Sequence, residues 1–210
     1  MSYEPKTEDI ARLRAETQAG IMDCKRALKE TEGDFEAARD LLRAQGLAGI
    51  QKRAARVAAE GGVFHYIHQI DPELPAKVGV LIELNCETDF VAKTPEFKEL
   101  GRNLAMHIAA MEPAWVSSSD VPEDVIEREK KIILESDAVK GKPDDVVSKI
   151  VDGKISSIYS EKGGALLAQK YVRDESGKQT VEGVIHDYAA KVKENVIVRR
   201  FARFRVGEES

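Results

Sequence analysis

The chain has 210 residues, of which 42% are hydrophobic and 33% charged, and its formal net charge at pH 7 is -5. This length allows one domain of ordinary size and a smaller one, with enough apolar residues for a real core. The net negative charge argues against a protein whose main task is to coat nucleic acid. The sequence has no run of about 18 apolar residues and its first residues lack the features of a secretory signal, so we expect a cytoplasmic protein.

The region between Thr7 and Gly46 is predicted to form three short helices. Asp34 is placed to cap the third helix and Gly46 to end it. The turn between the first two helices carries Ile21 and Met22, which a bundle of this size does not need to bury. A core of about forty residues is only marginally stable alone. We therefore expect residues 1–47 to form a small N-terminal three-helix module.

The composition changes after this module. Residues 48–62 are rich in Ala, Lys, Arg and Gly and show weak apolar periodicity, which is typical of a linker. Two strands are predicted next, over residues 63–69 and 77–86. The segment between them contains two prolines, which are found in connections and not in central strands. A β-hairpin is the simplest arrangement.

Further helices are predicted to begin close to Pro95, Pro122 and Pro143, because proline is favoured in the first turn of a helix. We expect these helices to cover the sheet. Residues 165–172 are expected to form another extended piece, and residues 181–192 a last helix.

Alternating apolar residues predict a final strand over residues 196–206. We expect Phe204 to pack in the core, with exposed Arg203 and other arginines surrounding Phe201. Residues 63–210 are therefore expected to form an α+β core, in which helices cover an antiparallel sheet.

The strand alternation stops at Thr88, within the sequence LNCETDFVAK of residues 84–93. Asp89 and Phe90 thus fall where a strand gives way to a helix, a place where a ring can be held outward on a rigid base. Position alone does not decide between roles, because a Phe just after a strand is more often a core residue than a contact for a partner.

A resemblance to a known family adds to this interpretation. Residues 84–93 resemble a signature of translation elongation factor Ts, the family of nucleotide exchange factors for elongation factor Tu. Residues 13–28, LRAETQAGIMDCKRAL, resemble the amino-terminal signature of the same family. Residues 194–200 and 204–207 resemble its carboxy-terminal part. The likeness extends over nearly the whole chain.

The resemblance implies a ubiquitin-associated-like module, an α+β core and promotion of GDP release from elongation factor Tu, with no covalent chemistry and hence no enzymatic activity. It also implies a homodimer, as in the short members of the family, in which sheets from two chains complete what one chain lacks. The implied contacts with elongation factor Tu are an exchange wedge of Thr88, Asp89, Phe90 and Val91, a module contact of Arg14, Ile21 and Met22, and a third contact of Val192, Lys193 and Glu194.

Other classes of function remain open at this stage. The segment Arg199–Arg205 interleaves cationic and aromatic residues, as on surfaces that stack RNA bases, so the alternative is an RNA-binding accessory protein of the ribosome. Cys86 beside a histidine would be needed for a thiol enzyme. His65 and His68 are three apart and so point to opposite faces of a strand, which argues against a metal site. We expect no cofactor, no metal, no membrane partner and no direct nucleic-acid contact.

Overall fold

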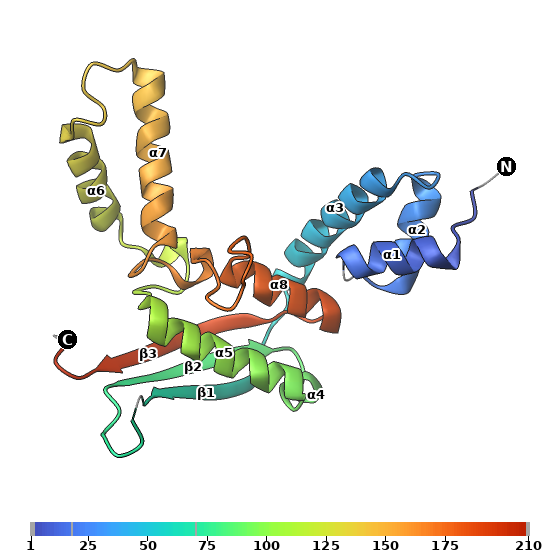
Figure 1. Ribbon diagram of the computed structural model, residues 1–210, viewed down its shortest axis with the longest axis horizontal. Coiled ribbons are helices and arrows are strands. Elements are labelled where there is room, and N and C mark those ends of the chain that lie inside the picture. Colours follow the sequence, from blue (N-terminus) through green and yellow to red (C-terminus); the bar gives the residue numbers. More distant parts are fainter. Residues whose placement is uncertain (1–2, 18, 70, 209–210) are drawn as a thin grey trace.

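The fold is α+β, as the sequence predicts, and the described residues contain one three-stranded sheet (Figure 1). A computed structural model of the protein describes residues 3–17, 19–69 and 71–208. In chain order the elements are α1 (Thr7–Thr17), α2 (Ile21–Glu30), α3 (Phe35–Ala54), β1 (Glu60–His68), β2 (Val78–Cys86), α4 (Asp89–Ala92), α5 (Pro95–Met111), the 3-10 turn η1 (Ser118–Asp120), α6 (Glu123–Glu135), α7 (Asp144–Ser160), the 3-10 turn η2 (Leu166–Ala168), α8 (Val181–Val192) and β3 (Ile197–Arg205).

The first three helices pack around a small core of their own. Leu13, Cys24 and Leu28 are fully buried in it. Asp34 caps α3 as expected, because its carboxylate accepts a hydrogen bond from the backbone N–H of Ala37.

The predicted end of α3 at Gly46 is wrong, since the helix continues to Ala54. One glycine inside a helix costs only about 1 kcal/mol relative to alanine, and the residues that follow Gly46 are mostly good helix formers. The first part of the predicted linker, residues 48–54, is therefore helical. The non-helical stretch before β1 is short.

The sheet has the order β1-β2-β3 with antiparallel pairing throughout. Helix α5 lies across one face of it (Figure 1). Thr94 caps this helix and Pro95 occupies its first turn, as predicted. The alternation in β2 is confirmed, because Val80, Ile82, Leu84 and Cys86 are all buried against the helices.

The expected orientation of β3 is wrong. A β-bulge places Val198 opposite Leu84 but Arg200 opposite Glu83, so the alternation shifts by one residue at Arg199. Beyond the bulge it is Phe201, paired with Ile82, that packs against the core. Phe204 lies on the opposite face and is 70% exposed.

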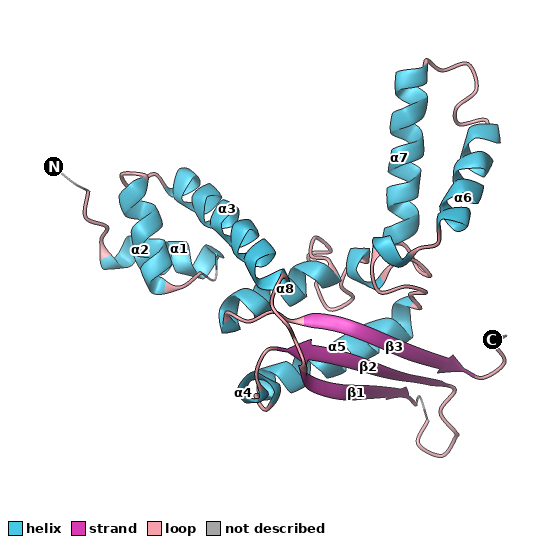
Figure 2. Ribbon diagram, turned by 180° about the vertical axis from the view of Figure 1, so that it is seen from behind, coloured by secondary structure: helices cyan, strands magenta, loops and turns pink. Residues whose placement is uncertain are grey.

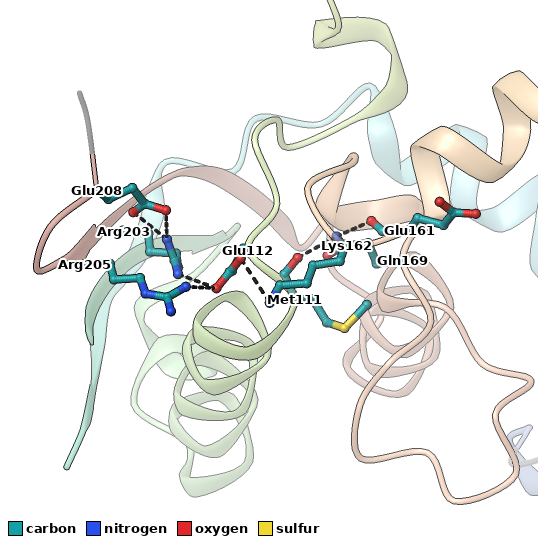
Figure 3. A network of polar contacts seen from close by, with 8 residues as sticks. All are labelled: Met111, Glu112, Glu161, Lys162, Gln169, Arg203, Arg205 and Glu208. Atoms are coloured by element: carbon teal, nitrogen blue, oxygen red, sulfur yellow. Dashed lines mark hydrogen bonds and ion pairs between the residues drawn. The ribbon is translucent and has the colours of Figure 1, made fainter. Parts of the chain in front are cut away.

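The side chain of Arg203 is 8% exposed, so the expectation that it lies in solvent is also wrong. Its guanidinium pairs with Glu112 and Glu208 at 2.7 Å each. Arg205 and Lys162 also reach Glu112, at 2.9 and 3.1 Å (Figure 3). These cations lower the pKa of Glu112, although its partial burial acts in the opposite direction. The network ties β3 to the end of α5 and to the residues after α7.

Helices α6 and α7 do not cover the sheet, contrary to expectation. They form a helical hairpin that projects away from it (Figures 1 and 2). Ile133, Val139 and Ile155 make a separate small core between them. Because this pair buries its apolar faces against each other, it does not need the sheet for that purpose.

Residues 165–172 do not form a strand either. They contain η2 and one isolated bridge at each end. Gln169, which is fully buried, donates hydrogen bonds to the carbonyls of Met111 and Glu161 and bonds the ring of His107. The segment is therefore held by hydrogen bonds to the ends of α5 and α7, and not by the hydrogen bonds of a strand ladder.

Candidate functional site

The short helix α4 holds Phe90 outward at the end of β2. The ring is 78% exposed. Thr88 caps the helix through a hydrogen bond that its hydroxyl accepts from the backbone N–H of Val91, at 3.4 Å. Val91 packs against the core, so the helix is fixed on one side and presents Phe90 on the other. The expectation that Phe90 is not a core residue is confirmed.

Asp89 stands beside Phe90 and forms an ion pair with Lys93 one helical turn later. The hydrogen bond from Lys93 lowers the pKa of Asp89, which is therefore ionised at neutral pH. Exposed pairs of this kind contribute little to stability. A carboxylate and a ring are thus presented together at the surface.

The structure brings the segment after α8 to the same place. Glu194 accepts hydrogen bonds from the backbone N–H groups of Glu87 and Thr88, so two of the three predicted contact sets are neighbours. Lys193 ends α8 in the left-handed conformation, with φ of 61°. Sequence reasoning missed Arg56, whose guanidinium lies 3.3 Å from Glu87. No local pattern in the sequence signals that contact.

The remaining predicted set, which consists of Arg14, Ile21 and Met22, lies on the N-terminal module. Ile21 and Met22 begin α2 and are 54% and 72% exposed, and Arg14 is exposed in the last turn of α1. The turn before them is held by Cys24, whose thiol donates to the carbonyl of Ala19. Residue 18 of this turn lies outside the described residues.

The cysteines and histidines do not form a reactive centre in the part of the chain that the structure describes. Cys24 and Cys86 are fully buried, and burial raises the pKa of Cys86 to about 11, so it is a neutral thiol at pH 7. Among the described residues, no group of three or more His, Cys, Asp or Glu side chains could hold a metal ion. His107 is buried and hydrogen-bonded to Gln169.

The arginines of β3 are largely paired within the chain. Arg200 lies 2.7 Å from Glu83, while Arg203 and Arg205 share Glu112. Phe201 faces the core. The charge and the ring that a stacking platform for RNA needs are therefore mostly engaged in other contacts.

Among the described residues, no helix covers the face of the sheet opposite α5 (Figure 2). Val63, Ile67, Leu81 and Phe204 are each at least half exposed on it. They come from all three strands, and the pairing of Ile67 with Gly79 and of Gly79 with Phe204 brings two of them onto one row. We call these four residues the outer sheet face.

Comparison with known proteins identifies the class of protein to which this fold and its exposed turn belong. Residues 49–208 match the family described as Elongation factor TS. Elongation factor Ts of Fervidobacterium nodosum is 47% identical over 205 residues, covering 98% of this chain and 100% of that protein. The protein of the same name from Pseudothermotoga lettingae is 50% identical over 200 residues, covering 95% and 96%.

The chain therefore belongs to the elongation factor Ts family, and its role is that of an elongation factor in protein synthesis. Within the described residues, the structure contains no helix long and apolar enough to cross a membrane.

Proposed function

We propose that this protein promotes the release of GDP from elongation factor Tu in the cytoplasm, as a nucleotide exchange factor and not as an enzyme. The observation that carries the proposal is the exposed ring of Phe90 beside Asp89, on a helix capped at the end of β2. In this proposal Thr88, Asp89, Phe90 and Val91 form the wedge that enters the GTPase near its Mg²⁺ and phosphate loop.

The physical basis is linkage between two ligands. If the factor weakens GDP binding, GDP weakens binding of the factor to the same extent. GTPases hold the nucleotide largely through Mg²⁺ and charge-assisted bonds at the phosphates, so a small displacement of those groups is enough to release it. A rigid wedge needs no bond-making residue.

The N-terminal module is proposed to supply a second contact. The proposed boundaries are residues 1–47 for the module, 48–62 for the connection and 63–210 for the core, although α3 extends into the connection and β1 already begins at Glu60. Arg14, Ile21 and Met22 would bind a helix of elongation factor Tu, and their exposure is consistent with this role. Val192 and Lys193, next to α4, would add a third contact.

We further propose a homodimer in which the outer sheet faces of two chains pack together. Exposed apolar side chains from all three strands lie on this face beside the ion pair of Arg200 and Glu83, and two copies would cover them symmetrically. The RNA-binding alternative has less support, since most arginines of β3 are already paired. Neither a direct nucleic-acid contact nor a cofactor is part of the proposal.

The decisive experiment measures release of a fluorescent GDP analogue from elongation factor Tu. Adding the protein should accelerate release, and the protein should bind the nucleotide-free GTPase much more tightly than the GDP-bound form. Equal affinity for both forms, with no acceleration, would refute the proposal. Binding to RNA that falls steeply with added salt would instead support the alternative.

A further inference from the structure

Glu194 joins two parts of the chain that are far apart in sequence. It follows α8, yet its carboxylate reaches the end of β2. One oxygen accepts hydrogen bonds from the backbone N–H groups of Glu87 and Thr88, both at 3.1 Å. The other accepts a bond from the hydroxyl of Thr88 at 2.5 Å. Both carboxylate oxygens are thus engaged within the chain.

This contact determines how the hydroxyl of Thr88 is oriented. Since its hydrogen points to Glu194, its lone pairs are left to accept from the backbone N–H of Val91. That bond caps α4, a helix of four residues that has no stability of its own. Hydrogen bonds to an ionised carboxylate are about twice as strong as neutral ones. A chain of hydrogen bonds thus connects Glu194 through Thr88 to the helix that carries Phe90.

A reciprocal contact strengthens this arrangement. Glu87 accepts hydrogen bonds from the backbone N–H of Asn195 and from the guanidinium of Arg56. Asn195 in turn donates to the carbonyl of Arg56. The end of β2, the start of β3 and the residues after α3 are thus held together behind the α4 helix.

We propose that Glu194 is a positioning residue for nucleotide exchange, which acts by holding Thr88 and hence the direction of Phe90. This inference rests on the proposed function. It differs from the direct contact with elongation factor Tu that the family resemblance implies for Glu194, because three of the roughly four lone-pair sites of this carboxylate already accept hydrogen bonds within the chain.

A double-mutant cycle separates the two roles. GDP release from elongation factor Tu is measured with the wild-type protein, Glu194→Ala, Phe90→Ala and the double variant. If Glu194 acts through Phe90, Glu194→Ala lowers the stimulated release rate about 10-fold in the wild-type background and less than about 2-fold in the Phe90→Ala background. Glu175→Ala, at an exposed position, is the matched control and should change neither rate.

Hydrogen exchange in the free protein gives a second readout that does not depend on activity. Glu194→Ala should lose protection at the amides of Glu87, Thr88 and Val91. Glu194→Gln keeps an acceptor oxygen and the shape of the side chain, so it should retain most of that protection and of the exchange activity. If Glu194→Ala does not fold, Glu194→Gln still tests whether an acceptor at this position holds Thr88.

Equal losses of exchange in both backgrounds would overturn the inference and favour a direct contact. Unchanged amide protection in a folded Glu194→Ala variant would overturn it as well. Failure of the proposed function has a different signature, because the wild-type protein would then not accelerate GDP release at all, and the positioning role in exchange would fall with it.

Discussion

Two phenylalanines of the α+β domain, Phe90 and Phe204, are similarly exposed but have different surroundings. Phe90 is 78% exposed and stands on a short capped helix with polar groups behind it. Phe204 is 70% exposed and belongs to the outer sheet face, together with Val63, Ile67 and Leu81. A single ring on a rigid projection suits insertion into a partner, whereas a broad apolar face suits coverage by a surface of the same shape. Exposure alone therefore does not define what a residue binds.

The largest expected effect is on the free energy of unfolding, and it distinguishes the exposed ring of Phe90 from a buried ring. Phe97 is fully buried and contacts the rings of Phe64 and Tyr188. We expect Phe97→Ala to lower the free energy of unfolding by about 3 to 5 kcal/mol, because it leaves a cavity. Phe90→Ala should change it by less than about 0.5 kcal/mol. Urea unfolding tests both, and a loss above about 2 kcal/mol for Phe90→Ala would mean that the ring belongs to the core.

The second effect concerns binding. We expect Phe90→Ala to weaken binding to nucleotide-free elongation factor Tu by about 2 kcal/mol, which is roughly 30-fold, because anchoring aromatic residues dominate interfaces. Leu74→Ala is the control. It shortens another exposed apolar side chain, which is 61% exposed in the connection between β1 and β2, at the far end of β2 from α4. Similar losses of binding affinity for the two variants would show that Phe90 contributes no more to binding than any other exposed apolar side chain.

The third effect tests the outer sheet face. Phe204→Glu should raise the dissociation constant of the proposed dimer about 10-fold or more, because it places a charge in an apolar contact. Ile132→Glu, at an exposed position of α6 in the hairpin that projects from the sheet, should leave it unchanged. Sedimentation velocity over a range of protein concentrations measures both. A wild-type protein that stays monomeric at micromolar concentration would contradict the dimer itself.

The smallest expected effect is the pH dependence of stability that arises from His107, which lies in α5. Burial lowers the pKa of His107, and its Nδ1 accepts a hydrogen bond from the backbone N–H of Val172, so the folded protein disfavours protonation of this ring. The unfolded chain binds a proton at this histidine as the pH falls below about 6.5, whereas the folded one resists it. Stability should therefore decline from pH 7.5 to pH 5.5.

Urea unfolding of the wild-type protein and of His107→Asn at both pH values isolates this contribution. The amide oxygen of asparagine is an acceptor that does not titrate in this range, so the variant should show a smaller decline. An equal decline in both proteins would show that other groups cause the pH dependence.

Local patterns predicted much of the site. The alternation in β2, the cap at Thr94 and the end of the strand at Thr88 are short-range features, and they correctly predict that Phe90 lies at a strand-to-helix turn. The two signature segments identify the family. The α+β class follows from the same periodicities, because each element needs only its own residues to show which face is apolar.

Contacts between distant residues decided the rest. The bulge at Arg199 reversed the faces of Phe201 and Phe204, and the pairing of α6 with α7 removed them from the sheet. Neither is visible in a window of neighbouring residues. The support of α4 by Glu194 joins positions 106 residues apart in sequence. The sequence alone determined most of the helices and strands and that Phe90 follows β2, but not the length of α3 or the conformation of residues 165–172. The tertiary structure determined which faces are covered and what holds Phe90 in place, because burial and hydrogen bonding depend on partners that only folding brings together.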